Sequence, residues 1–300
     1  MKINIVFQIE ENKQTIIISN ESNSVKAQII PNEGGRLAGV TLNDRTIIAE
    51  QSHFPYCQSS ASAIMFPFVN RIEDGRYSFE GKTYQIVCNE LEKNNAIHGL
   101  LYTRAFEVHS TKVLETSASL TLRYVYDGTT QGFPFPFDFY ITYTFTETTL
   151  LVNMKVTNTG AQNFPFTIGW HPYFMADNLY ESMLNFDCET EYTTTLDRSL
   201  TDGTTKHTLS KPFQIQNTEF DTAYKLKSPE IQFTTATYKA TIQGNAAENF
   251  VQFFTPSTKN IIAIEPTVGL SNSFNNGIGL QKLAAGKTYE ITWRVVVEKL

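Results

Sequence analysis

The chain has 300 residues, of which 24 are basic and 30 acidic, so its formal net charge is −6. Aromatic residues make up 13% of the chain and charged residues only 18%, which excludes the charge-rich, aromatic-poor composition of disordered proteins. Proteins that bind nucleic acids normally carry a basic face, and no run of Lys or Arg stands out here. We therefore expect a folded protein that does not bind nucleic acid.

The three cysteines, Cys57, Cys88 and Cys188, are too widely spaced to indicate a disulfide framework or a metal site. We expect reduced thiols. The first residues reach charged side chains before any apolar stretch long enough for a signal peptide, and no run approaches the roughly 18 apolar residues that span a bilayer. The sequence therefore predicts a cytoplasmic protein with no membrane partner.

Taken in chain order, apolar residues recur with a period of two, which is typical of strands with one buried face. The alternation predicts a short hairpin at residues 77–87 and a strand at 119–127. It also predicts a long hairpin at 139–157 with its turn near 147–149, and a C-terminal strand at 289–298. The polar stretch 189–210 is expected to form a long loop or meander, and no helical stripe of 12 residues occurs. We predict an all-β fold, a large antiparallel β-sandwich, as one domain over residues 1–300.

Common catalytic motifs are missing, since the chain has no GxxxxGK[ST], GxSxG or HExxH. Three segments instead place polar residues among aromatic ones. The first contains Asn70, Arg71 and His98. A guanidinium between an apolar run and Ile72 requires oxygen partners, either those of a ligand or those of a structural carboxylate. His98, which precedes Gly99, is a loop histidine with either a catalytic or a purely structural role.

The other two segments each supply one group that can exchange protons. His171 lies between Trp170 and Pro172 in FTIGWHPYF, where the proline favours an extended backbone. Glu265 ends the apolar run 261–264, and a carboxyl group at the end of a buried strand acquires a raised pKa, as a general base requires. The alternatives are a histidine packed in an aromatic cluster and a glutamate facing solvent. Together the segments predict a general acid–base site.

These segments also carry a family resemblance. NRI followed by NAIHG around His98, GWHPYF around His171, and AIEP around Glu265 with the following SFNNG resemble, in order, three signatures of the aldose 1-epimerase (galactose mutarotase) family. The resemblance implies a large β-supersandwich with its site in a cleft on one sheet. It also implies interconversion of the α and β anomers of a small-molecule sugar, without a metal or organic cofactor.

The resemblance assigns roles to individual residues. Glu265 would be the base that removes the C1 hydroxyl proton, His171 the acid that protonates the ring oxygen, and His98 an assistant to them. Substrate binding would fall to a set of neighbouring polar and aromatic residues: Arg71, Asn70, Trp170 and, from the weaker match NTEFDTAYKL, Asp221. Tyr173 and Phe174 are further candidates for an aromatic wall against the sugar.

The flanking residues depart from well-known galactose mutarotases. IMFPFV precedes NRI where a glycine–arginine pair is usual, and Leu100 stands where a second glycine would follow Gly99. The reaction type is therefore better supported than the identity of the sugar. A sugar-phosphate mutarotase and a non-catalytic carbohydrate-binding domain remain alternatives, and we expect a monomer or a homodimer.

Overall fold

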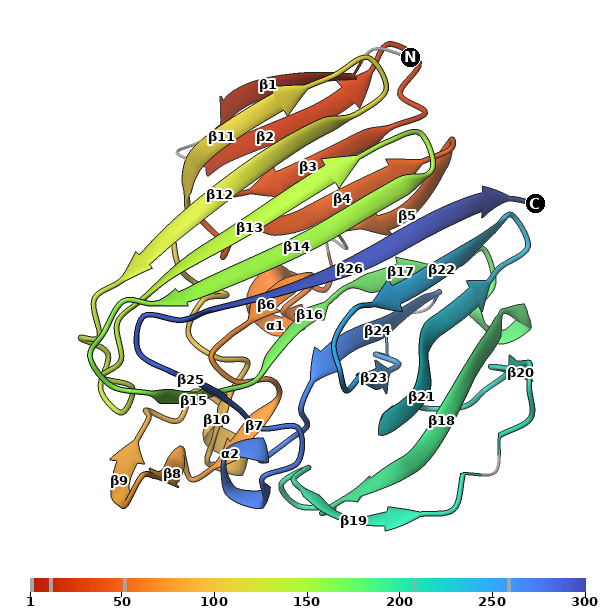
Figure 1. The fold of residues 1–300 in the computed structure, drawn as a ribbon. Helices are drawn as coiled ribbons and strands as arrows, with labels where there is room; N and C mark the ends of the chain where they lie inside the picture. Colours follow the sequence, from red (N-terminus) through yellow and green to blue (C-terminus); the bar gives the residue numbers. More distant parts are fainter. Residues whose placement is uncertain (1–2, 11–12, 51–52, 208, 258–259) are drawn as a thin grey trace.

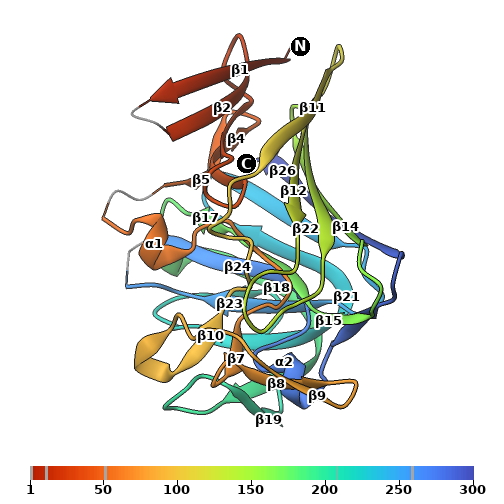
Figure 2. The same ribbon diagram turned by 90° about the vertical axis from the view of Figure 1, so that its left-hand side faces the viewer.

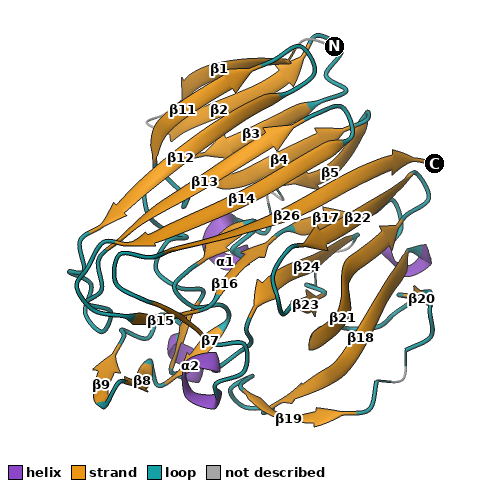
Figure 3. Cartoon of the chain, in the orientation of Figure 1, coloured by secondary structure: helices purple, strands orange, loops and turns teal. Residues whose placement is uncertain are grey.

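Antiparallel strands account for most of the computed structural model, which describes residues 3–10, 13–50, 53–207, 209–257 and 260–300 (Figure 3). The described α-helices are two single turns, α1 (Tyr56–Ser59) and α2 (Ser273–Asn276), and 3₁₀ turns occur at Leu91–Lys93 and Leu179–Glu181. No helix in this part of the chain is long and apolar enough to cross a membrane. The prediction of an all-β fold is confirmed.

Two sheets form the body of the molecule. The five-stranded sheet has the order β1-β2-β3-β4-β5, and the fifteen-stranded sheet runs β11-β12-β13-β14-β26-β22-β21-β23-β24-β16-β6, with β17, β18, β19 and β20 attached beside this path. The first sheet comprises β1 (Ile3–Glu10), β2 (Lys13–Asn20), β3 (Lys26–Ile30), β4 (Arg36–Leu42) and β5 (Arg45–Ala49).

The large sheet draws strands from most of the chain. Its strands are β6 (Ala63–Met65), β11 (Glu107–Val113), β12 (Ala118–Tyr126), β13 (Phe137–Phe145), β14 (Thr149–Asn158), β16 (Ile168–His171), β17 (Tyr173–Met175), β18 (Met183–Thr194), β19 (Thr201–Thr205), β20 (Phe213–Gln214), β21 (Asp221–Thr234), β22 (Tyr238–Gly244), β23 (Phe250–Phe254), β24 (Ile261–Val268) and β26 (Thr288–Lys299). Three small pairs complete the fold: β7 (Arg71–Glu73) with β10 (Asn95–Ile97), β8 (Arg76–Phe79) with β9 (Lys82–Gln85), and β15 (Phe164–Phe166) with β25 (Gln281–Leu283).

The five-stranded sheet packs against β11–β14, so that the two sheets face each other as layers (Figures 1 and 2). Their apolar faces share one core, in which Ile18 and Leu37 belong to the first sheet and Ile141 and Tyr143 to the second. The Tyr143 hydroxyl donates a hydrogen bond of 2.9 Å to the carbonyl of Gly35, which joins the layers. Aromatic residues fill this space because large flat side chains bury much apolar area.

The predicted hairpins are confirmed, because the alternation that defines them matches the burial of their residues. Strands β13 and β14 pair from Phe145 and Leu150 at the turn to Phe137 and Asn158 at the far end. β8 pairs with β9, β12 covers the strand expected at 119–127, and β26 covers the C-terminal one. The stretch 189–210 is more ordered than a long loop: β18 continues to Thr194, turns, and pairs with β19, while residue 208 lies outside the described residues.

Candidate active site

Strands β16, β23 and β24, with the neighbouring β6, are buried on both faces, unlike the alternating strands β12, β13, β14 and β26. Every residue of β24 and of β16 is buried. Gln252 on β23 pairs directly with Glu265 on β24, so these two side chains lie on the same face of the sheet. A polar row therefore crosses strands that are otherwise apolar.

Glu265 and His171 meet on this face. His171 Nε2 lies 3.3 Å from Glu265 Oε1, and the two residues are only 5% and 2% exposed. The ring of His98 stands edge-on to that of His171, with centroids 5.1 Å apart and an interplanar angle of 88°. The alternative that Glu265 faces solvent is thus wrong, and the structure brings together the three residues predicted to act as acid and base.

Backbone geometry fixes the loop residues of the site. His98 and Asn70 both adopt left-handed conformations, with φ of 62° and 50°, and the His98 N–H donates to the Asn70 carbonyl at 2.8 Å. The next residue, Gly99, has φ of 75°, and a Cβ there would lie 2.3 Å from the carbonyl oxygen of Phe66. Only glycine fits so close an approach, which explains the glycine after His98.

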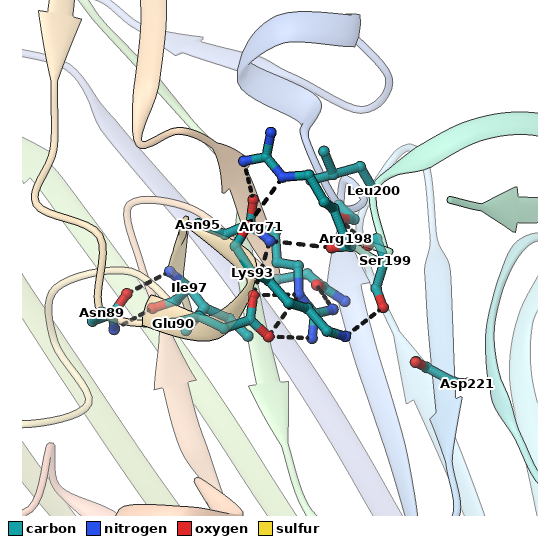
Figure 4. Close-up of polar contacts among 12 residues, drawn as sticks. Arg71, Asn89, Glu90, Lys93, Asn95, Ile97, Arg198, Ser199, Leu200 and Asp221 are labelled. Carbon is teal, nitrogen blue, oxygen red and sulfur yellow. Dashed lines mark hydrogen bonds and ion pairs between the residues drawn. The ribbon is translucent and has the colours of Figure 1, made fainter. Parts of the chain in front are cut away.

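Arg71 reaches the site from β7 with most of its donors occupied (Figure 4). Its Nε donates to both carboxylate oxygens of Glu90, at 2.8 and 3.1 Å, and its Nη2 donates to Glu90 Oε1 at 2.8 Å. Its Nη1 donates to Asn70 Oδ1 at 2.9 Å. Arg71 therefore has a structural carboxylate partner, Glu90, which is one of the two alternatives predicted for it. Within the described part of the chain, these contacts leave one N–H on each terminal nitrogen of the guanidinium without an acceptor.

Burial opposes charge on all three acid–base residues. It raises the pKa of Glu265 well above its usual range, an effect that the charge of Asp221 increases and that of Arg71 opposes. Burial also lowers the pKa of His171 to about 4, and that of His98 well below its usual range, with smaller contributions from nearby positive groups. Burial therefore favours a protonated Glu265 facing a neutral His171.

The predicted binding aspartate lies at the rim of the site. Asp221 is exposed at the start of β21, and its Oδ1 accepts a hydrogen bond of 2.8 Å from Gln252 Nε2. Gln252 thereby connects Asp221 to the strand position beside Glu265. Gln252 was not among the predicted site residues, although a single glutamine inside the apolar run FVQFF was a usable signal. Glu90 was missed too, since nothing in its local sequence marks it as the partner of Arg71.

Trp170, another residue of the predicted binding set, lies on the face of the sheet opposite His171. It is fully buried in the main core, and it pairs with Ile64, whereas His171 pairs with Ala63. Successive residues of a strand point to opposite faces, so the indole packs beneath the sheet. Phe174 is likewise in the core, and Tyr173 lies on the site face with its ring centroid 5.2 Å from that of His171.

A small hollow opens beside Glu265. It holds about 10 Å³ and is lined by residues of β6, β23, β24 and the loops beside them: Met65, Val69, Asn70, Gln252, Glu265, Thr267, Gly269, Leu270 and Ser271. That volume suits one water-sized group such as a hydroxyl. A larger hollow of about 710 Å³, around Asp177–Tyr180 and Asn217–Glu219, contains none of the predicted site residues.

The chain is a β-sandwich protein with a cluster of two histidines and a glutamate, and comparisons with known proteins show its family. Residues 14–295 match the family model described as Aldose 1-epimerase, so the chain belongs to this family and the predicted resemblance is confirmed. Over 243 residues it is 25% identical to the uncharacterised protein YihR of Escherichia coli (strain K12), a match that covers 77% of each chain.

Solved structures show the same fold. A galactose mutarotase-like protein from Clostridium acetobutylicum superposes with a TM-score of 0.88 at 18% identity, over 100% of this chain and 99% of that one. A galactose 1-epimerase from Lactobacillus acidophilus NCFM superposes with a TM-score of 0.81 at 15% identity, again over 100% and 99% of the two chains. At these identities the likeness establishes the galactose mutarotase-like architecture.

Proposed function

We propose that this protein is an aldose 1-epimerase that interconverts the α and β anomers of an uncharged aldose. The observation that carries the proposal is the buried contact of 3.3 Å between Glu265 and His171, with His98 edge-on to the imidazole. Mutarotation requires one proton to leave O1 and one to reach the ring oxygen, and a positioned acid and base each supply roughly 10²–10⁴-fold. Membership of the aldose 1-epimerase family supports the same reaction.

The proton balance follows from the two groups. Glu265 takes the proton of the C1 hydroxyl as the bond between C1 and the ring oxygen breaks, and His171 gives a proton to that oxygen. C1 becomes an aldehyde carbon, rotation about C1–C2 exchanges its faces, and reclosure returns both protons. This direction starts from carboxylate and imidazolium and ends with both groups neutral. The protonation of Glu265 and His171 that burial favours is therefore the one that accompanies the open-chain sugar.

Charge around the site favours a neutral sugar over a sugar phosphate. Glu90 occupies the bidentate edge of Arg71, which is the edge that would otherwise grip an anion. Arg198, the next guanidinium along the same wall, is paired with Glu73 and Asp74. The exposed carboxylate of Asp221 adds negative charge at the rim. The N–H groups of Arg71 that Glu90 and Asn70 leave available therefore suit single hydrogen bonds to hydroxyl groups.

The test is polarimetry on fresh single-anomer sugars, with glucose, galactose and glucose 6-phosphate in parallel. Glu265→Gln should lower the rate of anomer interconversion by about 10²-fold or more while the protein still folds. The matched control is Glu191→Gln, because Glu191 contacts His207 at the same distance, 3.3 Å, away from the predicted site residues. Equal rates for Glu265→Gln and wild type would refute the proposal. Sugar binding by calorimetry without any acceleration would favour a non-catalytic carbohydrate-binding domain, and a preference for the phosphate would favour a sugar-phosphate mutarotase.

A further inference from the structure

The turn between β18 and β19 places one side chain, that of Arg198, against the segment 93–95, which lies beside Arg71. Arg198 lies on this turn, and its Nη2 donates to Asn95 Oδ1 at 2.9 Å and to the Asn94 carbonyl at 2.8 Å. Its Nε donates to the Lys93 carbonyl at 3.0 Å. One guanidinium thus binds three consecutive residues that precede His98, and it comes from a hairpin more than 100 residues away in sequence (Figure 4).

Asn95 connects Arg198 to Glu90, the partner of Arg71. It is fully buried, and its Nδ2 donates to Glu90 Oε2 at 2.9 Å and to the Arg198 carbonyl at 3.1 Å. All the hydrogen-bonding groups of its amide are engaged, so its orientation is fixed. Glu90 in turn holds Arg71 through Nε and Nη2. An unbroken chain of hydrogen bonds therefore runs from Arg198 through Asn95 and Glu90 to Arg71.

The same turn also contacts the segment that lines the hollow beside Glu265. The hydroxyl of Ser271, a residue that lines the hollow beside Glu265, donates to the Ser199 carbonyl at 3.0 Å. The Ser199 hydroxyl accepts a hydrogen bond of 2.8 Å from Lys93 Nζ. The turn thus connects the segment that holds Arg71 to the segment beside Glu265, and it fixes the spacing between them.

We propose that Arg198 is a positioning residue: through Asn95 and Glu90 it holds the guanidinium of Arg71 where a sugar hydroxyl can reach it. This inference rests on the proposed function. Arg198 also forms ion pairs with Glu73 and Asp74, but these carboxylates are 46% and 53% exposed, and exposed ion pairs contribute little. The contact with the buried amide of Asn95 carries the effect.

The test compares Arg198→Met with wild type in the full chain by polarimetry, on the aldose that wild type converts fastest. We expect KM to rise roughly tenfold while kcat changes less than about threefold, because Arg71 contacts the sugar and not the reacting protons. Glu73→Gln is the matched control. It removes an ion pair that Arg198 makes through Nη1, whereas Nη2 binds Asn95, and it should leave KM unchanged.

A double-mutant cycle separates positioning from general loosening. In an Arg71→Met background, Arg198→Met should raise KM no further, because the group that it positions is already absent. An equal rise in both backgrounds, or an unchanged KM in the single variant, overturns the inference. If Arg198→Met fails to fold, Arg198→Lys replaces it, since lysine keeps the charge and loses the planar fork, and it should still raise KM.

Failure of the proposed function gives a different result. If wild type does not accelerate mutarotation, the sugar dissociation constants of wild type, the two single variants and the double variant are measured by calorimetry instead. Weaker binding by Arg198→Met, absent in the Arg71→Met background, then supports the inference without the reaction. A wild-type protein that neither converts nor binds any sugar of the panel overturns both.

Discussion

Two strips of the fifteen-stranded sheet use polar residues in opposite ways. In the alternating strip, β12, β13, β14 and β26, apolar residues face the core and polar ones face outward, where Thr121 and Thr142 share a hydrogen bond of 2.9 Å. In the site strip, β23, β24 and β16, the polar residues Gln252, Glu265 and His171 are 8% exposed or less. The same backbone pairing therefore supports a stable layer in one place and reactive groups in the other.

The difference lies in what covers the second face. Outward residues of the alternating strip keep contact with water, so their polar groups lose little hydration when the protein folds. The site strip is covered by the loops that carry Asn70, His98 and Ser271, which removes water from the carboxyl and imidazole groups. Burial of ionisable groups is unfavourable for folding and shifts their pKa values, which is how acid–base chemistry becomes possible. Three variants test this contrast, from the largest effect to the smallest.

The largest effect is expected from the inward face of the alternating strip. Phe139 is fully buried, with its ring centroid 5.0 Å from that of Phe66. Phe139→Ala should lower the free energy of unfolding by about 3–5 kcal/mol, because it removes buried apolar area and leaves a cavity. Urea unfolding followed by circular dichroism measures the loss. A loss below about 1 kcal/mol would mean that the two sheets are not packed as one core.

The alternating strip is also where the sequence predicted the fold well. One face of each strand meets water, so residues 139–157 carry a period of two that both identifies the hairpin and places its turn. The site strip lacks this signal, because a run such as IIAI is apolar on both faces. Its buried carboxylate was nevertheless identifiable, since Glu265 ends that run.

Contacts between distant segments could not be predicted. The motifs located His98, His171 and Glu265, but Glu90 and Arg198 have ordinary polar surroundings in the sequence and acquire their roles only when loops meet. The position of Trp170 was predictable in part. Once His171 is placed on the site face of a strand, alternation puts its neighbour on the other face.

In the site strip we expect a smaller effect on the free energy of unfolding, and there the substitution should stabilise the protein. Because burial raises the pKa of Glu265, its ionisation destabilises the folded state as pH rises above the unfolded value of about 4.3. Glu265→Gln should therefore be more stable than wild type at pH 8, by about 0.5–2 kcal/mol, and the difference should vanish near pH 4. Urea unfolding at several pH values measures it.

His171 does not disturb this comparison. Its pKa of about 4 means that the folded state gains stability as pH rises from about 4 towards 6.5, and this contribution is present in both proteins. The difference between the two unfolding curves therefore reports mainly on the carboxyl group. A variant that is less stable than wild type at pH 8 would show that ionised Glu265 is well solvated or well paired, which contradicts the burial on which the contrast depends.

The smallest effect is expected on the outward face of the alternating strip. Thr121 and Thr142 are direct cross-strand partners, and Thr142→Ala removes one hydroxyl of their hydrogen bond. The remaining hydroxyl is only partly buried and can turn to water, so the free energy of unfolding should fall by no more than about 0.5 kcal/mol. Parallel urea unfolding with Thr121→Ala and the double variant measures the coupling of the pair. A loss above about 1 kcal/mol would mean that this face is shielded from water as the site face is, and burial would then not distinguish it from the strip that holds Glu265 and His171.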